Sequence, residues 1–382
     1  MKAYCLNKIS RVALDALTAP DCTTENVNEA DSILLRSYAM ADYQLPESVL
    51  AVARAGAGVN NIPIERFAKE GVVVFNTPGA NANAVKELVL CGLLLSCRDI
   101  IGGNEWVRDN SDDEAISKSA ETAKSKFAGS EIMGKTLAVV GLGVIGAMVA
   151  NACVDLGMKV IGYDPYLSVQ NAMKLSRNVT YVAKLEEAVA DADFVSIHVP
   201  LTDSTKHMFS APIFSKMKDG VTLLNFARDT LVNDDDLLAS MESGKVKKYV
   251  TDFANRKVVK LKNTICLPHL GASTDEAEDN CAVMAVNQIK DYLENGSITN
   301  SVNYPTVHAG LKTTDYRICI NHLNLPGLIA QISSTVSKQG VNIVTMVNQS
   351  RNDFAYTVLD VEAEVDLDDI RKIEGVLRVR SI

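Results

Sequence analysis

The chain has 382 residues, 47% of them hydrophobic and 22% charged, and it carries a formal net charge of −9. Such a length suits two or three globular domains, and the composition supplies enough apolar residues for a large core. The acidic balance argues against a nucleic-acid partner, and no uninterrupted apolar stretch reaches the roughly 18 residues of a membrane span.

Eight cysteines are scattered along the chain without a CxxC pair or a Cys/His metal spacing: Cys5, Cys22, Cys91, Cys97, Cys153, Cys266, Cys281 and Cys319. Most lie in apolar surroundings, which is typical of free thiols in a reducing compartment. The first residues, Met1 to Leu6, predict a strand and not a signal peptide. We therefore expect a cytoplasmic protein without a bound metal.

The first hundred or so residues alternate short apolar runs with helical patterns. Strands are predicted at residues 32–36, 49–54 and 72–75, and a long apolar helix at 82–96. The polar stretch at residues 104–126 predicts an exposed helix or connector.

From Gly134 onward a strand–helix–strand pattern repeats several times. Strands are predicted to end near Val140, Tyr163, Ile197, Leu224 and Val250. This alternation predicts a doubly wound parallel sheet, and ligands bind such sheets at the carboxyl ends of the strands. A long helix at residues 273–295 follows, then a short strand at 300–305 that is expected to return to the first domain.

The C-terminal residues predict a separate module of two helices and four strands. In chain order the elements are strand 317–321, helix 326–339, strands 341–347 and 355–361, helix 367–374 and strand 377–381. This β-α-β-β-α-β order is that of a ferredoxin-like fold.

A glycine motif after the strand at Thr136–Val140 is the most informative feature of the chain. Gly141 permits a sharp turn, Gly143 permits close approach of a pyrophosphate, and Gly146 permits close packing of helix and strand. The helix start at Val144 and Ile145 then offers free N–H groups and a positive dipole end to phosphates.

A second apolar run ends at Asp164, eighteen residues after Gly146. A carboxylate at this position accepts hydrogen bonds from an adenosine ribose and repels a 2′-phosphate. The motif and Asp164 together predict a dinucleotide cofactor, NAD in preference to NADP.

Five segments, taken together, resemble the D-2-hydroxyacid dehydrogenase family, most closely the branch that acts on D-3-phosphoglycerate. They begin at Arg54, Gly134, His198, Leu224 and Pro268, and their order and spacing also match. The similarity covers residues 49 to 305 or so, and residues 314–382 resemble an amino-acid-sensing ACT module.

The resemblance implies a domain plan. A flavodoxin-like α/β substrate-binding domain comprises residues 1–98 and 282–306, and a Rossmann-type NAD-binding domain at 99–281 is inserted in it. Residues 307–313 are a linker to the ferredoxin-like ACT domain at 314–382.

Arg228 and His269 are the candidate catalytic residues. Arg228 closes a strand, and its planar guanidinium suits a substrate carboxylate and the carbonyl formed by hydride transfer. It could instead cap a helix or pair with Asp229, which stands where the family usually has glycine. Imidazole is the side chain best suited to proton exchange near neutral pH, so His269 could move the hydroxyl proton in either direction. Alternatively, it is a solvated loop residue.

The third catalytic residue departs from the family. The family pattern is Asp-Val-Phe-x-x-Glu-Pro, and its Glu polarises the histidine, whereas this chain has Lys257 five residues after Asp252. A cation there would lower the histidine pKa. Either Lys257 lies in the site as a desolvated acid/base or substrate ligand, which we favour slightly, or it points away and Asp252 or another acid supports His269.

The family resemblance assigns the rest of the cleft. Contacts to the substrate carboxylate, hydroxyl or phosphate are expected from Arg54, Gly56, Ala57, Gly58 and Asn81. Arg54 could hold a 3-phosphate or be a strand-end arginine in a surface ion pair. The cofactor pocket is expected to include His198, Pro200, Ala227, Asp252 and Gly271.

The C-terminal module presents polar residues that match ACT effector ligands: His322, Asn324 and Asn342. The resemblance implies L-serine bound between paired modules, while a purely structural dimerisation module is the alternative. A homodimer or homotetramer is expected.

The expected activity is NAD-dependent oxidation of D-3-phosphoglycerate, the first step of phosphorylated L-serine biosynthesis. Two alternatives stay open. The chain could act on another D-2-hydroxy acid, such as glyoxylate, hydroxypyruvate or a sugar-acid phosphate. It could also be an NAD-sensing corepressor that binds partner peptides with little turnover.

Overall fold

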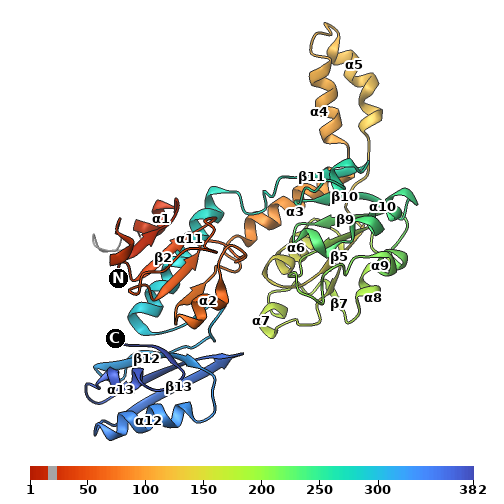
Figure 1. The fold of residues 1–382 in the computed structure, drawn as a ribbon. Helices are drawn as coiled ribbons and strands as arrows, with labels where there is room; N and C mark the ends of the chain where they lie inside the picture. Colours follow the sequence, from red (N-terminus) through yellow and green to blue (C-terminus); the bar gives the residue numbers. More distant parts are fainter. Residues whose placement is uncertain (16–23) are drawn as a thin grey trace. The chain divides into compact units, whose positions relative to one another are not determined.

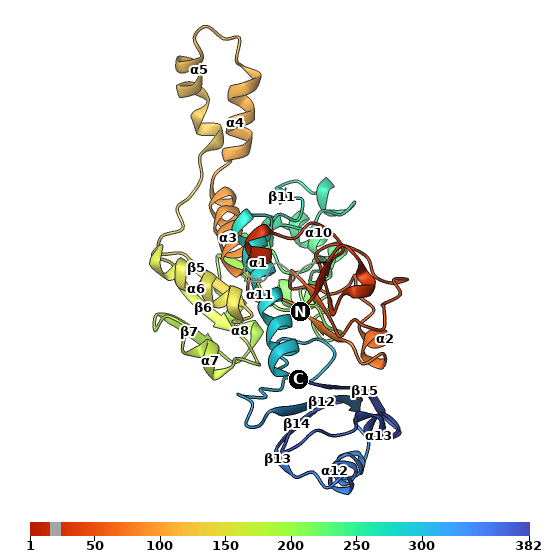
Figure 2. The same cartoon turned by 90° about the vertical axis from the view of Figure 1, so that its left-hand side faces the viewer.

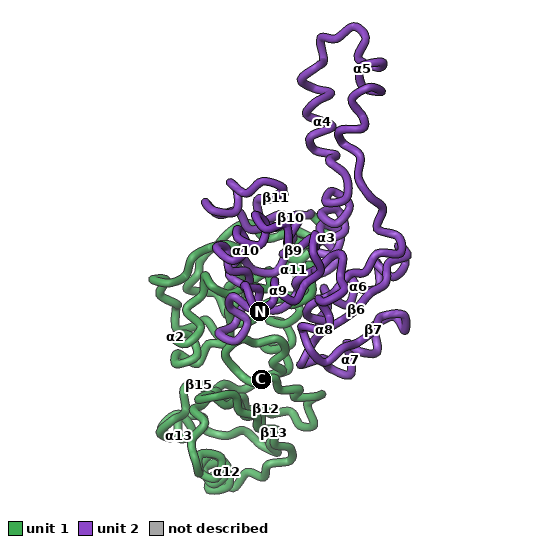
Figure 3. Tube along the Cα trace, turned by 90° about the vertical axis from the view of Figure 1, so that its right-hand side faces the viewer, with its two compact units in different colours: residues 1–81, 275–382 green, residues 82–274 purple. Residues whose placement is uncertain are grey.

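The computed structural model describes residues 1–15 and 24–382, and Cys22 lies outside them. The described residues form two compact units, one of residues 1–81 and 275–382 and the other of residues 82–274 (Figure 3). The helix at the first boundary belongs to the second unit because Gly92 packs against Phe226 and Val250 there. The predicted boundaries lay after residues 98 and 281.

The first unit begins with a parallel sheet in the order β1-β2-β3-β4. Its strands are β1 (Ala3–Cys5), β2 (Ser32–Leu35), β3 (Ala51–Arg54) and β4 (Val73–Phe75). It also contains the helices α1 (Arg11–Asp15), α2 (Ile64–Lys69) and α11 (Asp275–Asn295), and the short helix η1 (Val27–Glu29). Apolar residues of α11, including Ala285 and Ile289, join the core beneath β3 and β4.

The strand predicted at residues 300–305 is wrong as a regular strand. The segment forms an isolated bridge between Ser301 and Phe75, and Val302 N–H donates to the Val74 carbonyl at 2.9 Å. The buried Asn303 side chain accepts from Val74 N–H and donates to the Val72 carbonyl, each at 2.9 Å. A side chain thus takes over backbone pairing, which ends the ladder after one bridge.

The second unit is built on a seven-stranded parallel sheet in the order β11-β10-β9-β8-β5-β6-β7 (Figure 1). The strands are β5 (Thr136–Val140), β6 (Lys159–Tyr163), β7 (Val179–Val182), β8 (Phe194–Ile197), β9 (Val221–Asn225), β10 (Val246–Thr251) and β11 (Thr264–Cys266). The predicted Rossmann-type sheet is confirmed, and β7 and β11 extend it at both edges. The order in which successive strands are added to the sheet reverses between β5 and β8, and folds of this kind bind ligands at such a point.

Helices cover both faces of this sheet because alternate strand residues point to opposite sides. Leu137 and Val139 pack with α3 (Ala82–Cys97) and α6 (Val144–Asp155), whereas Ala138 and Val140 face the other core. That second core includes α8 (Leu185–Val189), α9 (Ala211–Lys216) and α10 (Asp234–Glu242). The short helices α7 (Val169–Ala172), η3 (Asp229–Leu231) and η4 (Val258–Lys260) complete the unit.

The polar stretch before β5 forms a helical hairpin and not a single helix. It consists of α4 (Ile100–Asp109), α5 (Ile116–Ala123) and the short helix η2 (Lys124–Phe127). The hairpin projects from the rest of its unit (Figure 2), and Ile100, Ile101 and Val107 are exposed on it.

The C-terminal module has the predicted ferredoxin-like order and an antiparallel sheet, β13-β14-β12-β15. Its elements are β12 (Tyr316–Leu323), α12 (Leu328–Lys338), β13 (Ile343–Arg351), β14 (Phe354–Val361), α13 (Leu367–Arg371) and β15 (Val376–Ser381). Ile318 and Ile320 pack under the two helices. Cys319 and Tyr356 share the core of α11 and β4, so both faces of this sheet are covered.

Arginines fix the module to the helix and sheet of the same unit. Arg317 pairs with Asp360 through two hydrogen bonds, at 2.6 and 2.9 Å, and both side chains are 1% exposed. Arg317 also donates to the carbonyl of Asn295, the last residue of α11, at 2.7 Å, and to three carbonyls of the predicted linker, Ala309, Gly310 and Leu311. Arg380 donates to the Leu293 carbonyl at 3.0 Å. Cationic donors at the end of α11 satisfy carbonyls that lack partners inside the helix.

Within the described ranges, no helix combines the length and apolar character needed to cross a membrane. The same residues contain no cluster of three or more His, Cys, Asp or Glu side chains suited to a metal ion.

Candidate functional site

The glycine loop after β5 has the geometry of a phosphate cradle. Gly141 has φ +96°, and a Cβ there would lie 2.7 Å from the His198 carbonyl group. A Cβ on Gly146 would collide with the Gly141 carbonyl oxygen, so only glycine allows α6 to start this close to the strand. A Cβ on Gly143 would have no neighbour within 4 Å. Gly143 therefore leaves open space beside the backbone. The turn predicted at Gly141 and the close packing predicted at Gly146 agree with this geometry, and pyrophosphate contact at Gly143 stays a prediction.

The N-terminus of α6 faces this space without a side-chain cap. Gly143 is the N-cap and provides no side-chain hydrogen bond, so the N–H groups of Val144 and Ile145 stay available to phosphate oxygens. The helix has 12 residues, which is long enough for a developed dipole. These residues fit a dinucleotide.

Asp164, at the end of β6, anchors the glycine loop. One carboxylate oxygen accepts from Leu142 N–H at 2.8 Å and the other from Tyr166 N–H at 2.8 Å. Each oxygen keeps a further lone pair, so the carboxylate can still accept ribose hydroxyls.

His198 directly follows β8 and lies against the glycine loop, where Cβ atoms added to Gly141 and Gly146 would meet it. Its Nε2 is 2.8 Å from the Ser196 hydroxyl, and burial lowers the pKa of His198 to about 4. It is therefore neutral at pH 7, which agrees with a role in shaping the pocket. The neighbouring Pro200 is exposed.

Arg228 follows β9 and is exposed. Its Nη1 donates to the neighbouring Ala227 carbonyl at 2.6 Å, and the other guanidinium N–H groups have no partner in the described parts of the chain. The predicted competitor Asp229 accepts from Thr230 N–H at 2.7 Å and forms no ion pair with Arg228. The guanidinium is therefore available to an anionic substrate.

The turn that presents Arg228 depends on Asn225, which the sequence analysis missed. The fully buried Asn225 side chain donates to the Arg228 carbonyl at 2.8 Å and accepts from Ala227 N–H at 3.2 Å. The sequence does contain a sign of this role, because Asn225 is a polar residue at the end of the apolar strand β9.

Asp252, at the end of β10, supports the backbone around His269. Its carboxylate is 1% exposed and accepts from Leu270 N–H and Gly271 N–H, each at 2.7 Å. His269 has φ +59°, a left-handed conformation that a non-glycine residue adopts only when its surroundings enforce it. Of the two predicted alternatives, support of His269 by Asp252 fits these contacts.

The interpretation of Lys257 as a desolvated acid/base is wrong. Its ammonium group is 60% exposed and pairs with Asp235 of α10 at 2.6 Å. The hydrogen bond that Lys257 donates to Asp235 raises the pKa of Lys257, whereas a general base at neutral pH needs a lowered one. The position of Lys257 in the motif does not predict this pairing, because Asp235 lies on a different element, α10.

The substrate residues predicted in the first unit lie at the carboxyl edge of the four-stranded sheet. Arg54 donates from Nε to the Arg36 carbonyl at 2.8 Å and from Nη1 to the Gly58 carbonyl. Gly56 N–H already donates to the Thr77 hydroxyl at 2.8 Å, so the expectation that it binds substrate is wrong. The N–H groups of Ala57 and Gly58 have no partner in the described chain and can bind an anion. Asn81 precedes α3 and is half-buried.

Arg36 is a second cation at this edge that the sequence analysis did not select. It follows β2, whose last residue Leu35 is in register with Arg54, and pairs with Glu278 at 2.5 Å. Its side chain is 38% exposed. The strand-end position that singled out Arg54 applies equally to Arg36.

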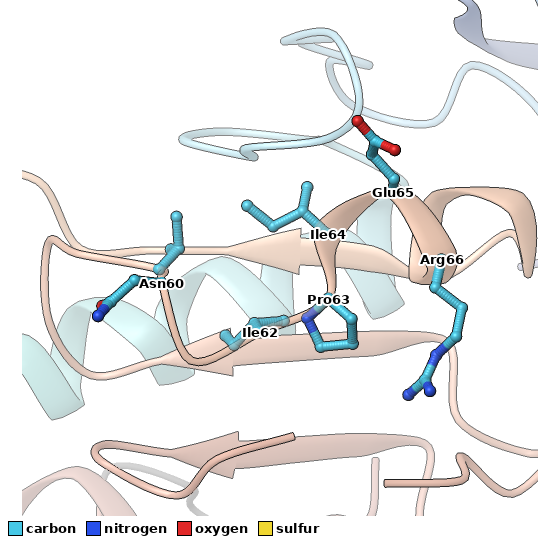
Figure 4. A pocket seen from close by; sticks show the side chains of 7 residues that line it. Asn60, Ile62, Pro63, Ile64, Glu65 and Arg66 are labelled. Atoms are coloured by element: carbon cyan, nitrogen blue, oxygen red, sulfur yellow. The ribbon is translucent and has the colours of Figure 1, made fainter. Parts of the chain in front are cut away.

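Two cavities of the first unit lie outside these contacts. One of about 620 Å³ is lined by residues 59, 60 and 62–66, just after the glycine-rich loop (Figure 4). Its Arg66 donates to the carbonyls of Ala41 and Tyr43, so the guanidinium is already used. The other, of about 530 Å³, is lined partly by Gln288, whose buried carboxamide has no partner in the described chain.

The C-terminal residues expected to bind an effector differ among themselves. The expectation of a free polar tip is wrong for His322, which is 2% exposed. Its Nδ1 lies 2.8 Å from the Leu323 carbonyl and its Nε2 2.8 Å from the Thr357 hydroxyl. Asn324 and Asn342 are exposed and bond to Asn352 and Glu362.

Comparisons with known proteins agree with this geometry. Residues 90–271 match the family model described as D-isomer specific 2-hydroxyacid dehydrogenase, NAD binding domain. A D-3-phosphoglycerate dehydrogenase of Escherichia coli K12 is 31% identical over 379 residues, covering 94% of this chain and 88% of that protein. The chloroplastic D-3-phosphoglycerate dehydrogenase 2 of Arabidopsis thaliana is 30% identical over 348 residues, 88% of this chain, and the chain spans only 53% of its length.

A hydroxypyruvate reductase of Thermotoga maritima is 34% identical over 275 residues, covering 69% of this chain and 85% of that protein. Among solved structures, NAD⁺-bound 3-phosphoglycerate dehydrogenase of Entamoeba histolytica aligns with a TM-score of 0.61 and 27% identity. That alignment covers 79% of this chain and 98% of the other.

Proposed function

Because this chain belongs to the D-2-hydroxyacid dehydrogenase family, we propose that it oxidises D-3-phosphoglycerate to 3-phosphohydroxypyruvate with NAD. We also propose that the protein catalyses this reaction, the first step of phosphorylated L-serine biosynthesis, in the cytoplasm. NAD supplies the hydride acceptor, held by the glycine loop and Asp164.

Side chains of the protein bind the substrate and transfer the hydroxyl proton. Arg228 binds the substrate carboxylate and stabilises the developing carbonyl, because its guanidinium N–H groups are exposed and available. His269 takes the hydroxyl proton in oxidation and returns it in reduction. The observation that carries the proposal is the common position of these groups: Arg228 follows β9, Asp252 follows β10 and His198 follows β8, all at the carboxyl edge of one parallel sheet.

A phosphorylated substrate is supported by the two arginines that end neighbouring strands β2 and β3. Arg36 and Arg54 place two guanidinium groups at one sheet edge, where Arg36 pairs with Glu278 at 2.5 Å. The N–H groups of Ala57 and Gly58, which have no partner in the described chain, lie in the adjoining loop. Guanidinium groups favour phosphate through bidentate hydrogen bonds.

The test follows NADH consumption with 3-phosphohydroxypyruvate, hydroxypyruvate, glyoxylate and pyruvate in parallel. We expect kcat/KM for the phosphorylated substrate to exceed the others by about 100-fold, since a lost charged hydrogen bond costs about 3 kcal/mol. Arg36→Met should raise KM for that substrate alone, while Arg371→Met, a matched exposed arginine, should change nothing. Equal turnover of all four substrates would retain the family chemistry and remove the phosphate assignment.

If the protein is instead an NAD-sensing corepressor, its function should not depend on Arg228 and His269. A peptide-binding protein would tolerate Arg228→Gln and His269→Gln, since neither change disturbs a buried contact. NADH binding without turnover of any substrate would favour that alternative.

We propose L-serine as the effector of the C-terminal module, bound between the modules of two subunits. Asn324 and Asn342 are exposed and offer amide groups to its carboxylate and ammonium. We also propose a homodimer or homotetramer, and the exposed Ile100, Ile101 and Val107 support association through the hairpin. Serine inhibition that persists unchanged in Asn342→Ala would argue against this effector site.

A further inference from the structure

Among the residues that the structure describes, no carboxylate bonds to the imidazole of His269. The residue aligned with the family's Glu is Lys257, which pairs with Asp235. In the described part of the chain, no hydrogen bond or ion pair reaches the His269 ring. Its one ring contact is with Phe253, at 5.0 Å between centroids and an interplanar angle of 66°.

Two consecutive residues after β10 hold His269: Asp252 fixes the backbone next to it, and Phe253 contacts its ring. Asp252 fixes the backbone by accepting the N–H groups of Leu270 and Gly271. Phe253 contacts the ring, and its own backbone is fixed by a 3.1 Å hydrogen bond to the Thr251 hydroxyl. The edge-to-face arrangement is a favoured geometry of aromatic pairs, so it restricts rotation of the imidazole.

We propose that Phe253 is the positioning residue for the His269 imidazole and replaces the carboxylate that the family uses. This inference rests on the proposed dehydrogenase function. Phe253 acts through His269, by holding the ring that receives the hydroxyl proton. Unlike a carboxylate, it orients the ring without adding a negative charge.

The test compares Phe253→Leu with Phe253→Tyr, which keeps the aromatic ring. In Phe253→Leu we expect kcat to fall about 2- to 12-fold, the factor that corresponds to the free energy of an aromatic contact, with the KM values for substrate and NADH unchanged. Phe253→Tyr should restore the wild-type kcat. Phe127→Leu is the matched control, because it removes a similar ring contact, to Trp106 on the projecting hairpin.

A second readout does not depend on activity. The chain has 5 histidines, so the imidazole signals can be resolved by NMR and His269 assigned with His269→Gln. Phe253→Leu should remove the ring-current shift of the His269 signal, while Phe253→Tyr and Phe127→Leu should keep it.

An unchanged His269 signal in Phe253→Leu would overturn the proposal, and any accompanying loss of kcat would then be ordinary destabilisation. A changed signal with an unchanged kcat would also overturn it, since the contact would then not position a reacting group. If the wild type turns over no 2-hydroxy acid, the proposed function fails separately from the ring contact.

Discussion

The exposed edge of the seven-stranded sheet and the C-terminal module use the same residue types in opposite ways. Arg228 donates one hydrogen bond to a neighbouring carbonyl and is exposed. Arg317 is 1% exposed and bonds to Asp360 and to four carbonyls. An arginine whose hydrogen bonds are consumed by the fold stabilises structure, while one with free donors can bind a ligand.

The histidines repeat this difference. His322 is buried with both ring nitrogens bonded, whereas His269 is exposed and lies against one aromatic ring. Sequence motifs alone predicted a functional role for both histidines, proton transfer for His269 and effector binding for His322. Burial and hydrogen bonding separate them, because a group with every donor and acceptor satisfied has little left for a ligand.

The largest expected effect comes from breaking the buried pair of the module. Arg317→Met leaves the Asp360 carboxylate buried without its partner, so we expect the free energy of unfolding to fall by about 3–5 kcal/mol. Urea unfolding measures this loss. Arg317→Met with Asp360→Leu should recover most of it, because no charge then remains buried. If the single variant unfolds like the wild type, the contrast between the two arginines fails.

Arg228→Lys tests the other side of the comparison. A lysine keeps the charge but loses the planar fork of donors, so we expect kcat/KM to fall about 100-fold or more while stability stays within about 0.5 kcal/mol. Steady-state kinetics and thermal unfolding are measured on the same preparation. A loss of stability comparable with that of Arg317→Met would show that Arg228 is structural.

His198 predicts a pH dependence of the second unit. Its folded pKa is lowered to about 4 by burial, below its value of about 6.5 in the unfolded chain. The unfolded state therefore binds the proton first, and stability falls as pH decreases from about 6.5 to about 4, by at most about 1.4 kcal/mol per pH unit. His198→Gln should flatten this part of the unfolding profile, and an unchanged slope would assign it to other groups.

The smallest expected effect is a gain. Both carboxamide atoms of Gln288, on α11, are buried and have no hydrogen-bond partner in the described chain, in contrast to the two bonded ring nitrogens of His322. Gln288→Leu should raise the free energy of unfolding by about 1 kcal/mol, since an unsatisfied buried polar group is removed. Gln288→Glu is the contrasting variant and should destabilise, because it buries a charge at the same position.

Local pattern made several elements predictable. The repeating apolar runs predicted the doubly wound sheet. The glycine motif predicted the dinucleotide cradle because its requirements are local: Gly141 needs a left-handed φ, and Gly146 packs against the Gly141 carbonyl five residues earlier. The order of elements in the C-terminal module followed from alternating and helical periods in the same way. The position of Arg228 at a strand end followed from the strand itself.

Contacts between distant residues decided the rest. Lys257 pairs with Asp235, 22 positions away, and His322 bonds to Thr357, 35 positions away. Asn303 bonds to Val72 and Val74 across more than two hundred residues and ends a predicted strand. Sequence by itself determined which residues carry suitable chemistry and where the backbone must turn. Tertiary structure decided which donors and acceptors stay unpaired, because that depends on partners that only folding brings within hydrogen-bond distance.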